Sequence, residues 1–189
     1  MNIRPASSSD AAALAAIEAV CFPAAEAAGP QAIAQRLAVF PDRFLVAEEA
    51  GVPIGFINGC AAGQPRITDD LYEDARLHRP DGPWQTVFGL DTLPEYRRRG
   101  VAAALMNAFI AQAKARGQLG VALTCKAHLV HYYERFGCRR GHFRQRARRC
   151  RPVRYGTSVL RQHRTIPAGR LARYCPEPPT PTFLRRPSL

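Results

Sequence analysis

Apolar residues in the first 137 positions recur with two different spacings, and the changes between them mark the expected elements. Spacings of three and four residues, as at Leu105, Phe109 and Ala113, predict helices with one buried face. Short apolar runs bounded by turn residues predict strands. The predicted strands are one around Ile3 and residues 43–48, 53–60, 84–92 and 119–125; the predicted helices are one that follows the capping residues 7–10 and ends before Pro23, and residues 30–40, 101–116 and 127–136.

The order of these elements is strand, helix, helix, three strands, helix, strand, helix. Residues 43–60 are predicted to form a hairpin, and residues 84–125 a strand–helix–strand crossover. This order predicts a three-layer mixed α/β fold. Residues 63–83 are a long polar stretch with a short helix expected over 69–76, and loops of this length in a compact domain are often functional.

The net charge of +12 belongs to the end of the chain. Residues 1–137 contain 13 Lys/Arg and 14 Asp/Glu, whereas residues 138–189 contain 14 Arg and a single acid, Glu177. We therefore expect a folded domain over residues 1–140. The basic, Pro/Arg-rich tail over 141–189 is expected to be largely disordered, with one plausible strand at 153–160.

The composition also bears on compartment and metal binding. No apolar run reaches the roughly 18 residues that a membrane span needs, and the first residues lack the apolar segment of a signal peptide. The six cysteines include no C-x-x-C pair, so we expect neither a zinc site nor a disulfide framework. We expect a cytoplasmic protein without metal, as a monomer or homodimer.

A phosphate site is predicted where the strand at 84–92 leads through a turn into the helix that begins at Val101. The first turn of a helix has unpaired N–H groups and the positive end of the helix dipole, and both favour phosphate. Gly100 lets the backbone approach a ligand closely, and the arginines at 97–99 add positive charge. On these residues alone, a solvated basic turn before an ordinary helix is an equally good interpretation.

The segment Arg97-x-x-Gly100-x-Ala102 resembles the (Q/R)-x-x-G-x-(G/A) signature of the GNAT acetyltransferases, and the flanking strands and helices follow that family's order. Further stretches resemble its arylalkylamine (serotonin) N-acetyltransferase branch and that branch's bacterial relatives. They are Cys21-Phe22-Pro23, residues 54–59, 69–72 and 77–82, Tyr96 to Gly100, and residues 123–137. The resemblance ends near residue 140.

The resemblance implies a GNAT fold, with a central mixed, mostly antiparallel sheet flanked by helices and a C-terminal hairpin that is missing or altered here. It implies acetyl-CoA as cosubstrate and direct attack on the thioester by a primary amine, in this branch a small aryl- or alkylamine. Tyr133 takes the position of the acid that protonates the leaving thiolate. The residues implied to bind acetyl-CoA are Leu90, Asp91, Thr92, Arg98, Arg99, Gly100, Val101, Ala102 and Ala103.

The sequence departs from the animal enzymes at the proton acceptor. Their two strand histidines, which help to take the proton of the amine through water, are replaced by Thr86 and Phe88. His78, His128 and His131 are other histidines of the domain, but a structural or surface role is the favoured interpretation for each. The base is then ordered water, or the amine arrives already neutral.

The acceptor and the tail leave alternatives open. Phe22, Pro23 and Trp84 are candidates for an apolar wall against the amine, and they suit an ordinary core equally well. A peptide or protein N-acetyltransferase of the same fold is one alternative function, and a protein that binds nucleic acid through its basic tail is another. The tail itself is either a functional arm or the out-of-frame translation of a GC-rich gene, which would leave the sheet with an uncovered edge beside residues 119–125.

Overall fold

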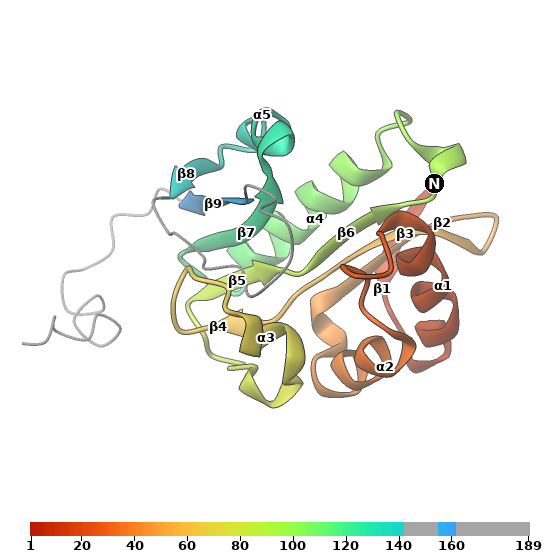
Figure 1. Cartoon of the computed structure of the whole chain (residues 1–189), viewed down its shortest axis with the longest axis horizontal. Coiled ribbons are helices and arrows are strands. Elements are labelled where there is room, and N and C mark those ends of the chain that lie inside the picture. Colours follow the sequence, from red (N-terminus) through yellow and green to blue (C-terminus); the bar gives the residue numbers. More distant parts are fainter. Residues whose placement is uncertain (142–154, 162–189) are drawn as a thin grey trace, which may run out of the picture.

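The computed structural model of the chain describes residues 1–141 and 155–161 (Figure 1). Its strands are β1 (Asn2–Pro5), β2 (Phe44–Glu49), β3 (Val52–Asn58), β4 (Ala61–Ala62), β5 (Trp84–Val87), β6 (Gly89–Thr92), β7 (Gly120–Lys126), β8 (Arg139–Gly141) and β9 (Tyr155–Arg161). Its helices are α1 (Ala11–Cys21), α2 (Pro30–Val39), α3 (Asp69–Glu73), α4 (Val101–Ala115) and α5 (Val130–Glu134), with 3₁₀ turns at Ser8–Asp10, Pro41–Arg43, Ala75–Leu77, Pro94–Tyr96 and Ala127–Leu129.

The strands form two sheets that meet where β5 leads into β6 (Figure 1). One sheet has the order β1-β2-β3-β6 and is antiparallel throughout. The other has the order β4-β5-β7-β9-β8, and among the described strands only β5 and β7 run parallel. A mixed, mostly antiparallel arrangement flanked by helices confirms the fold class that the sequence predicts.

The sheet β1-β2-β3-β6 has a buried apolar core on each of its two faces, as a three-layer fold requires. The inner stripe predicted for α4 is confirmed, because Leu105, Phe109 and Ala113 are at most 1% exposed. They pack with β7 and α5 in one core. On the opposite face the apolar residues of α1 and α2 pack against Phe44 and Phe56, whose rings are stacked at 6.5 Å between centroids.

The strand expected at residues 84–92 is interrupted at Phe88, and its two halves belong to different sheets. β5 runs parallel to β7 up to the pair Val87–Leu123, whereas β6 pairs antiparallel with β3. At the interruption the N–H of Phe88 donates to the carbonyl of Asn58 at 2.8 Å. The ring of Phe88 turns toward the aromatic residues beside α2. One continuous strand is therefore the wrong prediction here, because the chain changes its pairing partner at this residue.

The last described strands extend the second sheet. β9 pairs antiparallel with β7 along its full length, and β8 pairs with the outer edge of β9. The strand expected at 153–160 is thus present, and the C-terminal hairpin is altered rather than missing. The uncovered edge beside residues 119–125, which was expected only if the tail is an out-of-frame translation, is not found, because the backbone of β9 pairs with that edge. Residues 142–154 and 162–189, where a disordered tail is expected, lie outside the described residues.

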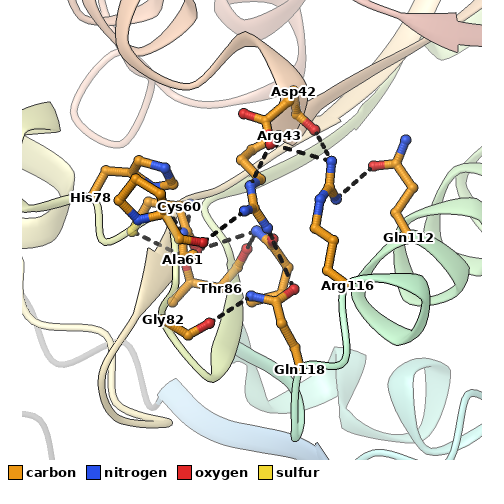
Figure 2. A network of polar contacts seen from close by, with 12 residues as sticks. Asp42, Arg43, Cys60, Ala61, His78, Gly82, Thr86, Gln112, Arg116 and Gln118 are labelled. Carbon is orange, nitrogen blue, oxygen red and sulfur yellow. Dashed lines mark hydrogen bonds and ion pairs between the residues drawn. The ribbon is translucent and has the colours of Figure 1, made fainter.

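The loop at residues 63–83 is fastened to the sheet by a buried polar network around Arg43 (Figure 2). The guanidinium of Arg43 donates to the side-chain oxygen of Gln85 on β5 at 2.9 Å and to the carbonyl of Pro80 in the loop at 3.2 Å. Gln118, just before β7, donates to another carbonyl of the same loop at 3.0 Å. Buried side chains from separate elements therefore hold this loop against the domain.

The carboxylate of Asp10 ties β1 to the start of α1. It accepts two hydrogen bonds from the guanidinium of Arg4, both 2.8 Å long, and one from the N–H of Ser7 at 2.7 Å. Arg4 thereby lowers the pKa of the Asp10 carboxyl far below its usual value. A carboxyl whose pKa is lower in the folded chain than in the unfolded chain stabilises the fold above about pH 4. That stabilisation is lost as the pH falls through the folded pKa.

We expect Asp10→Asn to lower the free energy of unfolding by about 1–2 kcal/mol at neutral pH, because charge-assisted hydrogen bonds are lost. Urea unfolding of wild type and variant at neutral pH and at about pH 3 measures this difference. The difference should narrow at the acidic pH. An equal difference at both pH values would show that the ionised carboxylate is not the stabilising form.

Candidate active site

β6 and β7 diverge beyond Phe88, which leaves one edge of β6 without a strand partner in the described chain. β7 continues beside β9, while β6 pairs with β3 alone. The peptide groups that β6 presents toward β7, along the segment that contains Leu90 and Asp91, are therefore available to a ligand. At the end of β6 the carbonyl of Thr92 is already engaged, because it accepts from the thiol of Cys21 at 3.3 Å.

The turn between β6 and α4 contains two residues with a left-handed backbone. Arg98 has a φ of 61°, and Gly100, which precedes α4, has a φ of 83°. The N–H of Ala104 donates to the carbonyl of Gly100 at 2.9 Å, so the amides of residues 101–103 precede the helical hydrogen bonds. A Cβ on Gly100 would meet no atom of the described residues within 4 Å, so the space beside it is open within that part of the chain. The turn brings together the residues expected to bind phosphate, which are Arg98, Arg99, Gly100, Val101, Ala102 and Ala103.

The three arginines of this turn make different contacts. Arg97 donates from Nε to the last carbonyl of β6 at 3.2 Å. Arg99 forms an ion pair with Glu49 at 3.1 Å, and its guanidinium lies 4.9 Å from the ring centre of Tyr96. Arg98 is exposed and has no ion-pair partner within the part of the chain that the structure describes. Arg98 is therefore the arginine that can turn toward a phosphate without breaking another contact.

Tyr133 projects from α5 into the core that α4 shares with β7. Its side chain is 9% exposed, and its ring meets that of Tyr132 edge-on, with the centroids 5.2 Å apart. Its hydroxyl has no hydrogen-bond partner among the described residues. Burial raises the pKa of Tyr133 well above its ordinary value, so the phenol is protonated at neutral pH. A protonated hydroxyl that nothing else engages can donate to a leaving group.

Thr86 has a structural role, and His78, His128 and His131 lie in surroundings that do not make them a base. The hydroxyl of Thr86 donates to the carbonyl of Cys60 at 2.8 Å. His78 accepts a hydrogen bond from the backbone of β4 at 3.1 Å, and burial lowers its pKa, so this ring is neutral. His131 pairs with a glutamate of α5 on the surface, and His128 is exposed.

Of the three residues considered for an apolar wall, Trp84 does not lie beside Phe22 and Pro23. Phe22 ends α1 and is half-buried, and Pro23 beside it is exposed. Trp84 lies at the far end of the β5–β6 segment, where its buried side chain packs with Ala122 and Leu119. Because the eight residues between Trp84 and the end of β6 span roughly 25 Å of extended chain, Trp84 is a core residue rather than part of a wall with Phe22.

Glu18 is a residue of this region that the sequence analysis missed. It is 5% exposed and lies against the side chain of Asp91, which was expected to act through its backbone only. The sequence did indicate that Glu18 is buried, because it follows Leu14 by four residues and therefore lies on the buried face of α1. The position of its partner on β6 could not be read from that spacing.

Known proteins share this architecture. The model of the acetyltransferase (GNAT) family matches residues 11–138. Among solved structures, the GphF GNAT-like decarboxylase in complex with isobutyryl-CoA is similar at 26% identity over 72% of both chains, with a TM-score of 0.62. The loading GNATL domain of CurA from Lyngbya majuscula is similar at 20% identity over 70% of this chain and 68% of that chain, with a TM-score of 0.61. The ribosomal-protein-S18-alanine N-acetyltransferase from Escherichia coli is similar at 17% identity over 87% of this chain and 96% of that chain, with a TM-score of 0.62.

No curated protein matches the sequence. Within the described residues, no helix combines the length and the apolar character needed to cross a membrane. The family match covers more than half of the chain, and it contains the diverging strands, the turn at Gly100 and Tyr133. The chain belongs to the acetyltransferase (GNAT) family, and it is an acetyltransferase with acetyl-CoA as its cosubstrate.

Proposed function

We propose that the chain transfers the acetyl group of acetyl-CoA to the nitrogen of a small primary amine, which attacks the thioester directly. The observation that carries this proposal is the divergence of β6 from β7 immediately before the open turn at Gly100. The edge of β6 that has no strand partner among the described residues leads to the backbone N–H groups at the start of α4, which precede the helical hydrogen bonds. Such a path suits an extended pantetheine arm that ends in a pyrophosphate.

Each part of this site has its own task in the proposal. The edge of β6 at Leu90, Asp91 and Thr92 binds the amide groups of the pantetheine arm, with Thr92 contributing its N–H because its carbonyl is already engaged. The turn amides and the charge of Arg98 hold the pyrophosphate. Tyr133 donates its proton to the sulfur that leaves, because burial keeps the phenol protonated. The turn residues assigned to the pyrophosphate are Arg98, Arg99, Gly100, Val101, Ala102 and Ala103.

The acceptor class rests on the resemblance to the arylalkylamine branch, carried by residues 21–23 and 123–137. Phe22 and Pro23, at the end of α1, are proposed to contact the apolar part of the amine. Trp84 is left out because it packs elsewhere. A peptide acceptor is the alternative within the same fold, since the E. coli ribosomal-protein-alanine enzyme shares the architecture at 17% identity, which bears on the fold alone.

A second candidate function is favoured by the similarity to the GNAT-like decarboxylase, which was solved with isobutyryl-CoA. Loss of carbon dioxide from a carboxylated acyl-CoA would use the same edge of β6 and the same turn, but it needs no amine. The proposed binding of nucleic acid depends on the basic tail, most of which lies outside the described residues.

Product analysis of the full chain tests these functions together. The chain is incubated with acetyl-CoA and, separately, 2-phenylethylamine, n-butylamine and a peptide with a free N-terminal alanine, and the acetylated products are separated by chromatography. We expect N-acetyl-2-phenylethylamine to form faster than the other products. Acetylation of the peptide alone would move the chain to the peptide class. Release of carbon dioxide from malonyl-CoA without acetylation of any amine would support the decarboxylase instead.

A further inference from the structure

Two carboxyl groups from different elements meet beside β6. Glu18 on α1 is 5% exposed, and Asp91 on β6 is 1% exposed. Both approach Gly89, where a Cβ would lie 2.9 Å from Asp91 Oδ2 and 3.3 Å from Glu18 Oε2. The absence of a side chain at Gly89 therefore lets the pair pack directly against the strand.

Several buried polar atoms around this pair have no hydrogen-bond partner in the described part of the chain. Asn58 is completely buried with both side-chain amide atoms unpaired, and its Nδ2 lies 3.2 Å from the same Cβ position on Gly89. The other unpaired atoms of this region are Glu18 Oε2, Asp91 Oδ1 and Oδ2, Thr92 Oγ1 and Thr124 Oγ1. Buried polar groups in folded proteins are almost always paired, so their concentration here indicates a place for a polar ligand.

Except for Thr92 Oγ1, which shares the face of Leu90, these atoms lie on the face of the sheet opposite α4. Leu90 packs in the core beside α4, and side chains alternate along a strand, so Asp91 points to the other face. On β7 Leu123 and Cys125 pack in that same core, so Thr124 also points away from α4. Asp91 and Thr124 therefore border the divergence of β6 and β7 from its two sides, on the face that carries α1.

The segment between α1 and α2 covers this place. Glu18 Oε1 accepts from the N–H of Ala28 at 3.0 Å, and Glu26 forms an ion pair with Lys126 at the end of β7 at 2.9 Å. This ion pair is partly exposed and therefore contributes little to keeping the segment in place.

Among the described residues, neither Glu18 nor Asp91 forms a direct ion pair, although two arginines face them. Burial raises the pKa of Glu18, and burial together with the charge of Glu18 raises the pKa of Asp91. Ionisation of either of two such adjacent carboxyl groups opposes ionisation of the other. The other titratable groups that face the pair are Arg36 from α2, Cys21 from α1, Arg97 from the turn before α4, and Tyr133 from α5.

We propose that Glu18 and Asp91 line the subsite for the amino group of the acceptor and accept its proton. The acceptor is a primary amine that arrives as an ammonium ion. The inference rests on the proposed function and supplies the base that Thr86 and Phe88 cannot be. A buried carboxyl group without a direct ion pair among the described residues favours a cation beside it. The unpaired side-chain oxygen of Asn58, on the same face as Asp91, accepts a further N–H bond.

The proposed step balances in atoms and charge. One N–H bond of the ammonium group breaks, and its proton passes to a carboxylate oxygen of the pair. The freed lone pair of the nitrogen attacks the thioester carbon, the C–S bond breaks, and the thiolate takes the proton of Tyr133. The nitrogen then gives its surplus proton to the Tyr133 oxygen, and the proton held by the pair returns to solvent.

Isosteric variants of the full chain test the inference. Asp91→Asn and Glu18→Gln keep the volume of each side chain and remove its acid. With acetyl-CoA and 2-phenylethylamine, each should lower kcat/KM by about 10²-fold. Each should also displace the acid limb of the pH profile, and Glu18→Gln should keep the wild-type melting-temperature shift with acetyl-CoA. A decrease by the same factor at every pH, or no decrease, would overturn the inference.

Two further measurements separate the possible failures. Asp10→Asn is the matched control, because it changes a buried aspartate distant from β6 and should keep the wild-type pH profile. In the CoA-saturated wild-type chain, carbon-13 NMR should show the carboxyl resonances of Glu18 and Asp91 titrating together and shifting when 2-phenylethylamine is added. Resonances that do not respond overturn the inference even where a variant fails to fold. A wild-type chain that acetylates no amine refutes the proposed function before any variant is compared.

Discussion

Replacing Gly100 with leucine is expected to abolish the rise in melting temperature that acetyl-CoA gives to the wild-type chain. Gly100 precedes the free amides of residues 101–103, and a Cβ there meets no atom of the described residues within 4 Å. A leucine side chain would therefore extend into the space proposed for the pyrophosphate. Losing two charge-assisted hydrogen bonds costs about 3–6 kcal/mol, which corresponds to about 10²–10⁴-fold in affinity.

This loss must be separated from backbone strain, because a leucine at positive φ costs about 1–2 kcal/mol of stability wherever it is placed. Gly117 is a matched control, with a φ of 70° at the other end of α4 and no atom within 4 Å of an added Cβ. Gly117→Leu should destabilise the free protein by a similar amount and keep the full acetyl-CoA shift. Scanning fluorimetry with and without acetyl-CoA measures both effects. Equal shifts in the two variants would place the pyrophosphate elsewhere.

The turn at Gly100 can be predicted from the sequence because everything that forms it is local. A glycine directly before an apolar helical stripe supplies the left-handed residue and the free amides, and both are found. The stripe of α4, with Leu105 and Phe109 innermost, depends in the same way on spacing alone. The different contacts of the three arginines cannot be predicted from local spacing, because the ion pair of Arg99 with Glu49 joins residues that are distant in the sequence.

The features that the sequence could not supply are set by distant partners. The run at 84–92 is apolar on both sides of Phe88, and only the competing edges of β3 and β7 divide it. The spacing of Glu18 from Leu14 predicts a buried acid, yet its contact with Asp91 follows from how α1 lies across β6. Trp84 is the opposite case: it is close in sequence to the residues of the candidate site, yet its side chain packs at the far end of its strand.

Tyr133→Phe is expected to lower kcat for acetyl transfer by about 10²–10³-fold and to leave the KM for acetyl-CoA nearly unchanged. Phenylalanine fills the same buried volume, so the edge-on contact with Tyr132 is kept. The hydroxyl has no hydrogen-bond partner among the described residues, so its removal leaves no group of those residues unsatisfied. Stability should therefore change little while the proton for the thiolate is lost. Steady-state kinetics with varied acetyl-CoA, together with thermal unfolding, measures the two effects.

Tyr132→Phe is the control for this variant, because Tyr132 is the neighbour of Tyr133 on the same helix and carries the same group. It should keep the kcat of the wild type. Burial raises the pKa of Tyr133, so the phenol stays protonated through mildly alkaline pH, and the ratio of wild-type to Tyr133→Phe kcat should stay constant there. A ratio that declines as the pH rises would mean that Tyr133 ionises in this range. A Tyr133→Phe enzyme as fast as wild type would mean that the thiolate departs without a proton from α5.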